Sequence, residues 1–260
     1  MARPARRARR GVAPASRLVG PVRVLPVLVV VLVVTLCSAA SAASAIAAGA
    51  DEAPASTGLS GNGVVRTTAP AGPGVAVVAW SPPVDGRVAI VVGNSTSAPV
   101  RVMQVVATAT DAGGARSVRA TTRRVVPQVL PPGAQGLGSV TFRKGSTRTS
   151  DTLAFTVRTA RVRARDSVPL ATGGFVLSPP GTGTPAQTLD LVVTNDTTAP
   201  VDGRIPVEVV CLGEAGVPAV AAAGAVARAK LPPGAATHAS VGFDLLCPVY
   251  VVGAEGRPAR

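Results

Sequence analysis

The chain has few of the residue types on which most catalytic and metal sites depend. Among its 260 residues are one histidine, His238, three cysteines and 13 scattered acidic residues. Acid–base and nucleophilic catalysis need such groups to converge, and His238 has no Ser or Cys motif near it. Two cysteines with one distant histidine fall short of a tetrahedral zinc set, and the glycine-rich residues 58–63 lack the context of a phosphate loop. The sequence therefore predicts a protein that is not an enzyme, with no catalytic residue, metal ligand or cofactor.

Aromatic residues are almost as scarce, because only four Phe, one Trp and one Tyr are present. Any hydrophobic core must therefore be built from aliphatic side chains. Val, Ala, Gly, Pro, Thr and Ser dominate instead: Val and Thr fit a pleated surface, whereas Gly and Pro mark turns. The chain length suits two small all-β domains of about 100 residues each.

Basic residues are concentrated at the N-terminus, where residues 1–23 hold seven Arg and no acid. An apolar run at 24–36 and a tract of small residues at 38–50 follow. This order matches the three regions of a secretory signal, with Ala-x-Ala-like cleavage sites at 41–43 and 45–47. Residues 1–50 are therefore interpreted as a signal peptide or signal anchor, and the protein as exported.

The sequence leaves open whether this leader is cleaved. Residues 24–50 carry no charge and could span about 30 Å of hydrocarbon as a helix, although the strongly apolar part is short for a membrane span. Two other export signals fit less well, because leucine precedes Cys37 where a lipoprotein box needs a small residue, and the Arg pairs at 6–7 and 9–10 lack the bulky residue of a twin-Arg signal. We interpret the Arg-rich head as positive-inside topology rather than as a nucleic-acid site.

Two nearly identical segments, NSTSAPV at residues 94–100 and NDTTAPV at residues 195–201, lie 101 residues apart. The same offset relates two LPPG segments, which begin at Leu130 and Leu231. A period this long indicates two tandem domains rather than a solenoid. The segments that begin at Asn94 and Asn195 also match the Asn-x-Thr glycosylation pattern. However, the Arg-rich, Lys-poor composition favours a bacterium with a GC-rich genome, so we expect both Asn side chains to bond nearby backbone at a turn.

Segments within each copy alternate between apolar and polar residues as half-buried strands do. The Ala-rich residues 220–230 favour helix by composition, but their counterpart in the first copy, 119–129, has a strand pattern, so a strand is expected there too. The sequence thus predicts an all-β fold of two tandem immunoglobulin-like β-sandwich domains after the hydrophobic leader. The residues expected to share inward faces are Val88, Ile90 and Val92; Met103, Val105, Ala107 and Ala109; Val140 and Phe142; Leu189, Leu191 and Val193; and Val241, Phe243 and Leu245.

In each copy a strand ends in Asn and a polar turn, and Pro-Val then starts a Val-rich strand. In the first copy that strand ends in Asp-x-Gly, at Asp111 and Gly113, and Leu-x-Pro-Gly follows. This order resembles the FxLYD-type and related immunoglobulin-like modules of exported bacterial proteins over most of residues 74–162 and 175–252. Alanine and threonine replace the aromatics of that motif. The resemblance implies the immunoglobulin-like fold and leaves the activity undefined.

These observations divide the chain into four parts. Residues 1–50 are the leader, 51–72 a flexible linker, 73–166 a basic immunoglobulin-like β-sandwich, and 170–254 a second one.

Cysteine usage distinguishes the two copies. Cys37 lies in the leader, so Cys211 and Cys247 are the only pair in the body, and an even pair in an exported chain is typical of a disulfide. The first copy has Thr110 and Ser146 at the matching positions, so the bridge is expected in the second copy alone. Two buried thiols are the alternative.

Positive charge also distinguishes the copies. From residue 61 to 169, fourteen basic residues face four acidic ones, whereas five face seven from residue 170 to 260. Several Arg residues of the first copy alternate with small residues and are expected on outward strand faces. Such a surface is either merely solvated or a site for anionic polymers or lipid head groups, whose binding salt would weaken. The candidate polyanion-binding face comprises Arg116, Arg119, Arg123, Arg143, Arg158, Arg161 and Arg163.

Two hypotheses of function follow. The first is a non-catalytic protein with tandem immunoglobulin-like modules for adhesion, scaffolding or protein interaction at the cell envelope, either secreted or anchored to the extracytoplasmic face of the membrane. The second is binding of anionic envelope polymer or lipid head groups through the Arg-rich face of the first domain. The expected partners are an envelope protein or an anionic polymer, and the membrane if the leader stays uncleaved; nucleic acid is not expected.

Overall fold

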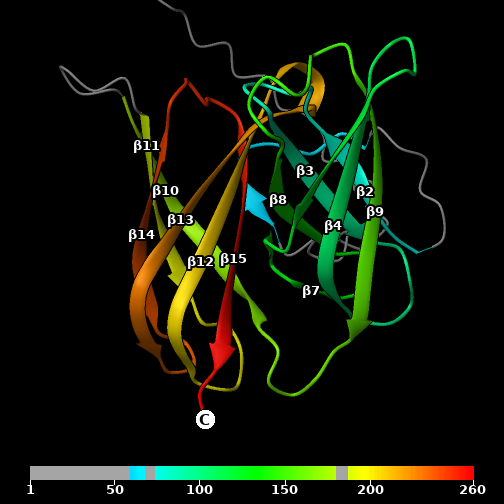
Figure 1. Ribbon diagram of the computed structural model, residues 1–260. Coiled ribbons are helices and arrows are strands. Elements are labelled where there is room, and N and C mark those ends of the chain that lie inside the picture. The colour runs from blue at the N-terminus through cyan, green and yellow to red at the C-terminus, as the bar shows by residue number, and fades with distance from the viewer. Residues whose placement is uncertain (1–58, 68–73, 180–186) are drawn as a thin grey trace, which may run out of the picture. The chain divides into compact units, whose positions relative to one another are not determined.

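The structure is a computed structural model that describes residues 59–67, 74–179 and 187–260 (Figure 1). Its strands pair only in antiparallel fashion, and one 3-10 turn, η1 (Glu214–Gly216), is the only helical element in these ranges. The all-β prediction is confirmed; the predicted leader lies outside the described residues. The strands are β1 (Ser60–Gly61), β2 (Val75–Trp80), β3 (Arg87–Asn94), β4 (Val100–Thr110), β5 (Ser117–Thr122), β6 (Val125–Val126), β7 (Val129–Leu130), β8 (Gln135–Thr141), β9 (Thr152–Arg161), β10 (Val168–Ser178), β11 (Gln187–Thr194), β12 (Val201–Leu212), β13 (Pro218–Leu231), β14 (Ala236–Phe243) and β15 (Tyr250–Pro258).

The first half of the described chain, β2 to β9, forms two sheets. One has the order β2-β3-β8-β6, and in the other β4 is flanked by β5 and β9 and also pairs with β7. Side chains of both sheets form one hydrophobic cluster, which includes the predicted residues Val88, Ile90 and Val92. Two of the few aromatic residues, Trp80 and Phe155, pack against this cluster, and their ring centroids are 5.3 Å apart. This packing resembles a β-sandwich.

Two side chains expected to face inward are exposed instead. A β-bulge between Val102 and Gln104 shifts the alternation of β4, so Val102 is buried and Met103 lies outside. Strand β14 ends at Phe243, and Leu245 in the loop beyond it is exposed. The remaining residues of these two sets lie in the hydrophobic clusters of their halves as predicted.

The second half, β10 to β15, repeats this arrangement of strands. Strand β12 lies between β13 and β15, while β11 lies between β10 and β14. Strand β10 joins the two sets, since Val168–Leu170 pair with β15 and later residues pair with β11. The strand expected at residues 220–230 is confirmed as β13 despite its alanine content. The disulfide between Cys211 and Cys247 is present, and both residues belong to the buried cluster of this half.

The sequence offset of 101 reappears as a register of strand pairing. Val88 pairs with Val140 between β3 and β8, and Leu189 pairs with Val241 between β11 and β14, 101 residues further on at both positions. The flanking pairs repeat as well, because β4 pairs with β5 and β9 as β12 pairs with β13 and β15. The duplication read from the sequence is therefore a duplication of strand topology.

Asn94 and Asn195 occupy equivalent corners of the two halves. The side-chain nitrogen of Asn94 donates hydrogen bonds to the carbonyl oxygens of Ala98 and Leu130, both at 2.9 Å. Its side-chain oxygen accepts from the backbone nitrogen and hydroxyl of Thr96 at 3.0 and 2.6 Å. Asn195 repeats all four bonds 101 residues later. With 2% and 0% of their surface exposed, both Asn residues are structural, in agreement with the turn interpretation and not with glycosylation.

A third hydrophobic cluster joins the halves. Ala89, Val91 and Leu137 of the β2-β3-β8 sheet pack against Val210 and Val251 of the β13-β12-β15 sheet. Consequently β3 is buried on both faces, with one face in the core of its own half and the other against the second half. The sheets of the two halves thus lie one against another within one compact unit (Figure 1).

Part of the segment expected to be a linker, residues 51–72, belongs to the second half. Within its described residues 59–67, Ser60 and Gly61 form β1 and pair with Val252 and Val251 of β15. Asn62 follows them; its side-chain nitrogen donates to the carbonyl oxygen of Pro248, and its side-chain oxygen accepts from the backbone nitrogen of Tyr250, both at 2.8 Å. Here β10 has turned away to β11, so β1 covers backbone groups of β15 that would otherwise be unpaired.

Candidate anion-binding site

The structure distributes the seven arginines of the candidate polyanion-binding face over several surfaces. Arg119 and Arg158 point outward from β5 and β9, on the two sides of β4. Arg116 lies beyond the Thr110 end of β4, whereas Arg161 and Arg163 lie at its Val100 end. Arg143 follows β8 in the other sheet. These residues therefore do not form one compact patch.

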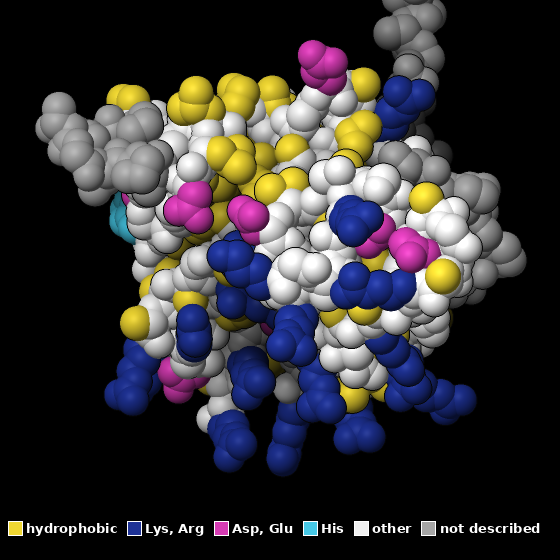
Figure 2. All heavy atoms as spheres, turned by 45° about the horizontal axis from the view of Figure 1, so that its top comes forward, with side chains coloured by type: hydrophobic (Ala, Val, Ile, Leu, Met, Phe, Trp, Pro, Cys, Tyr) yellow, Lys and Arg dark blue, Asp and Glu magenta, His cyan; other side chains and the backbone are white. Residues whose placement is uncertain are grey.

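The seventh of these residues, Arg123, lines a pocket of about 820 Å³ together with residues of the second half. The pocket lies beside the inter-half contact, and Figure 2 shows Lys and Arg side chains gathered at the lower end of the molecule in that view. Basic side chains from both halves meet in this pocket, whereas the candidate face predicted from the sequence lies in the first half alone. The lining includes Arg123, Arg124 and Gln128 of the first half, Ser167 of the connection between β9 and β10, and Asp202, Arg204, Glu255, Arg257 and Arg260 of the second half.

The segment 123–128 brings the arginines of the first half to this pocket. After β5 ends at Thr122, the chain crosses to the other sheet, where β6 pairs with β8. It lies directly on β15 of the second half: a Cβ atom at residue 253 would be only 2.5 Å from the carbonyl oxygen of Val126. Gly253 therefore permits the close approach that places Arg123 and Arg124 beside β12 and β15.

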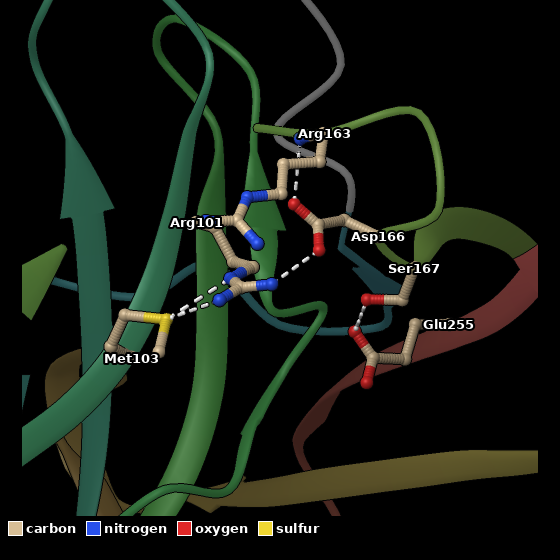
Figure 3. Close-up of polar contacts among 6 residues, drawn as sticks. All are labelled: Arg101, Met103, Arg163, Asp166, Ser167 and Glu255. Carbon is tan, nitrogen blue, oxygen red and sulfur yellow. Dashed lines mark hydrogen bonds and ion pairs between the residues drawn. The ribbon is translucent and has the colours of Figure 1, made fainter. Parts of the chain in front are cut away.

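Glu255 connects this segment with the second half. Its carboxylate accepts a hydrogen bond from the backbone nitrogen of Gln128 at 2.5 Å. It accepts a second one from the hydroxyl of Ser167 at 2.7 Å (Figure 3). Burial raises the pKa of Glu255, against the lowering effect of these two hydrogen bonds and of the charges of Arg257 and Arg124. The carboxylate of Glu255 thus connects β15 with the segment 123–128 and with Ser167.

Glu208 of β12 is the second buried acid of this region. Its side chain is 1% exposed, and an ion pair of 3.1 Å joins its carboxylate to the Nε atom of Arg124. Neither carboxylate oxygen has a hydrogen bond, whereas Arg124 also donates from Nη2 to the carbonyl oxygen of Gly224 at 3.3 Å. Arg124 is therefore held by the second half, while its partly exposed side chain lines the pocket.

The burial of Glu208 makes stability depend on pH. Burial raises the pKa of Glu208 from 4.5 to about 7, against the charges of Arg124 and Arg87. In the unfolded chain Glu208 loses its proton near pH 4.5. Between pH 4.5 and about 7 the folded chain therefore binds one more proton than the unfolded chain. The resulting stabilisation is complete below pH 4.5 and is lost as pH rises through the folded-state pKa of about 7. The free energy of unfolding should therefore fall by about 3 kcal/mol between about pH 5 and about pH 8 on this account.

Urea denaturation of the full chain across this pH range checks the expectation. Glu208→Gln should flatten the decline, and Glu214→Gln, which changes an exposed acid of the same half, should preserve it. A Glu208→Gln protein with the pH slope of the unmodified chain would contradict it. Glu255 is expected to add a decline of the same sign, because its pKa is also raised.

A second carboxylate arrangement fixes the connection between β9 and β10. Arg101 of β4 forms an ion pair with Asp166, which also accepts a hydrogen bond of 2.7 Å from the backbone nitrogen of Arg163 (Figure 3). Burial opposes ionisation of Asp166, but these hydrogen bonds and the charges of Arg101 and Arg163 lower its pKa overall. Arg163 is therefore part of a local turn as well as of the predicted basic face.

His238, the single histidine of the sequence, is not among the residues that line the pocket. His238 is exposed on β14 opposite Val192. No group of three His, Cys, Asp or Glu residues suited to hold a metal is found within the described ranges. In the same part of the chain, no helix is both long and apolar enough to cross a membrane.

Comparisons with known proteins do not assign the chain to a family. No protein-family model matches the chain, and no curated protein sequence matches it. Among solved structures, one neighbour is procruciferin, an 11S globulin from Brassica napus, with 8% sequence identity over 66% of this chain and 77% of that one. The TM-score of 0.13 is too low for this likeness to support any argument about fold or function.

Proposed function

We propose that the chain is a non-catalytic protein of the bacterial cell envelope, exported or membrane-anchored, in which two tandem immunoglobulin-like modules together bind an anionic polymer. Export is supported by the order of basic, apolar and small residues in the sequence of residues 1–50 and by a disulfide in the body. The tandem modules are supported by the strand register that repeats at an offset of 101 residues.

The observation that carries the proposal is the convergence of five arginines on one pocket. Arg123 and Arg124 come from the first half, and Arg204, Arg257 and Arg260 come from the second. A cleft lined by one sign of charge raises the local concentration of ions of the opposite sign. Of the two acids in the lining, Glu255 already accepts two hydrogen bonds from the protein, so arginine side chains dominate what the pocket offers to a ligand.

Binding of the full chain to linear polyphosphate, measured at low and at physiological ionic strength, tests this proposal. The double variant Arg204→Gln/Arg257→Gln should weaken binding about tenfold at low salt, since each partly exposed charge contributes up to about 1 kcal/mol. Added salt should also weaken polyphosphate binding by the unmodified chain, because salt screens the attraction between the arginines and the phosphates.

The variant Arg116→Gln/Arg143→Gln is a matched control. It removes the same charge from loops that follow β4 and β8, outside the pocket lining, and leaves the seven Arg of residues 1–23 in place. It should keep affinity within about twofold of the unmodified chain. Equal losses in the two double variants would show that net charge, not the pocket, attracts the polymer. Vesicles of phosphatidylglycerol are a second ligand in this test. Binding to the vesicles but not to polyphosphate would identify a lipid surface, instead of a polymer, as the ligand.

A further inference from the structure

A second hollow adjoins the anion-binding pocket. It has a volume of about 530 Å³ and is lined by Asp202, Gly203, Arg204 and residues 227–230. Asp202, Gly203 and Arg204 line the first pocket as well. The two hollows therefore lie on either side of one short segment of β12.

A β-bulge in the β12–β13 pair coincides with the second hollow. Gly203 pairs with Ala229, but Ile205 pairs with Val226, so Arg204 faces two residues of β13, Ala227 and Arg228. At this point Gly203 has a φ of 100°, a conformation that a residue with a side chain would adopt only under strain. Such bulges bend a strand and redirect its side chains, and here the redirected region is basic and exposed.

The charges of the two hollows are separated by an acid. Asp202 lies directly opposite Lys230 on β13 and Arg257 on β15, so these three side chains form a row across the sheet in the order basic, acidic, basic. Arg228 and Lys230 belong to the second hollow only, and four arginines belong to the first only. Lys230 attracts an anionic group at one end of this row and Arg257 attracts one at the other end, whereas Asp202 between them repels it.

We propose that the two hollows are neighbouring subsites for a linear polymer whose anionic groups are separated by neutral units, such as a chain of phosphodiester-linked polyols. This inference rests on the proposed function and specifies its ligand. One anionic group would occupy each hollow, and a neutral unit would pass over Asp202. A ligand with two linked groups gains affinity because the second group binds at a high effective concentration.

Glycerol phosphate oligomers of defined length, with glycerol phosphate itself as the monomer, test the inference by calorimetry on the full chain. Affinity should rise about 100-fold from one phosphate to an oligomer long enough to span both hollows. Arg228→Gln/Lys230→Gln should remove this gain and leave the affinity for the monomer within about twofold. The control Arg143→Gln/Lys144→Gln also removes one Arg and one Lys, both exposed, but from a loop outside both hollows. It should keep the gain in affinity with oligomer length.

Asp202 provides an independent variant. Asp202→Asn should strengthen binding of polyphosphate, whose charges are dense, by several-fold more than binding of the spaced oligomer, because only the dense polymer must place a charge above residue 202. An equal effect on the two polymers would overturn the proposed spacing.

Other outcomes separate the inference from the proposed function. Equal affinity for the monomer and the oligomer, or a length gain that survives Arg228→Gln/Lys230→Gln, overturns the two-subsite arrangement. If the monomer still binds and Arg204→Gln/Arg257→Gln weakens it, the anion-binding pocket stands without the second subsite. If no phosphate ester or polyphosphate binds the full chain, the proposed function fails together with the inference.

Discussion

Replacing Asn195 by alanine is expected to lower the free energy of unfolding by roughly 3–5 kcal/mol, because the change removes four hydrogen bonds that fix a corner of the second half. The side-chain nitrogen of Asn195 donates to the carbonyl oxygens of Ala199 and Leu231 at 2.9 and 2.8 Å. Its side-chain oxygen accepts from the backbone nitrogen and the hydroxyl of Thr197. Asn195 exposes none of its surface, and its bond to the carbonyl oxygen of Leu231 is buried.

The duplication supplies a second instance of the same experiment. Asn94→Ala removes the equivalent four bonds, together with a further one to the carbonyl oxygen of Pro131 at 3.1 Å, and should cost a similar amount. Urea denaturation measures both variants. The fluorescence of Trp80, the only tryptophan of the chain, reports on the first half, and hydrogen exchange distinguishes the halves.

Asn62→Ala is the matched control, because Asn62 also makes two hydrogen bonds to backbone groups but is exposed. Water can satisfy those groups after the change, so the expected cost is about 1 kcal/mol. If Asn94→Ala and Asn195→Ala cost no more than Asn62→Ala, the corners do not stabilise the halves in the way described.

The sequence predicted the repeated features of the fold well because they depend on local pattern and on comparison of the two copies. Alternation with period two identifies the inward face of a regular strand, as it did for Val88, Ile90 and Val92. Comparison with the first copy also outweighed the alanine content of β13. The helix propensity of alanine is small beside the pairing of a complete strand with β12.

Alternation could not reveal where a strand gains a residue or where it ends. The bulge in β4 moved Met103 outward and Val102 inward, and the end of β14 left Leu245 in a loop. The burial of the second face of β3 did have a signal in the sequence. Residues 88–92 are apolar at every position, and such a continuous run is typical of a strand covered on both faces.

The pocket could be predicted only in part. Basic residues of the first half, Arg123 among them, were a candidate anion-binding face, but Arg204 and Arg257 are isolated basic residues in a half with more acids than bases. They lie beside Arg123 and Arg124 only because the outer faces of two sheets pack together. Nothing in the local sequence encodes that contact, since it joins segments about 80 to 130 residues apart.

Removing the disulfide is expected to destabilise the second half by roughly 3–4 kcal/mol. The bridge joins residues 36 positions apart, and in the chain-entropy model the closure of a loop of this length restricts the unfolded chain by about that amount. Cys211 lies in β12, and Cys247 lies in the loop between β14 and β15, where its backbone nitrogen donates to the side-chain oxygen of Gln187 at 2.6 Å. Cys211→Ala/Cys247→Ala tests the loss directly by urea denaturation.

Reduction of the unmodified bridge separates the loss of the cross-link from the loss of side-chain volume. Both experiments use a Cys37→Ser background, so that a third thiol cannot exchange with the pair. In hydrogen exchange, residues of β12, β14 and β15 should lose more protection than residues of β3 and β8, since only the second half contains the cross-link. An unfolding midpoint that reduction leaves unchanged, or an equal loss of protection in the two halves, would contradict the expected stabilisation of the second half by the bridge.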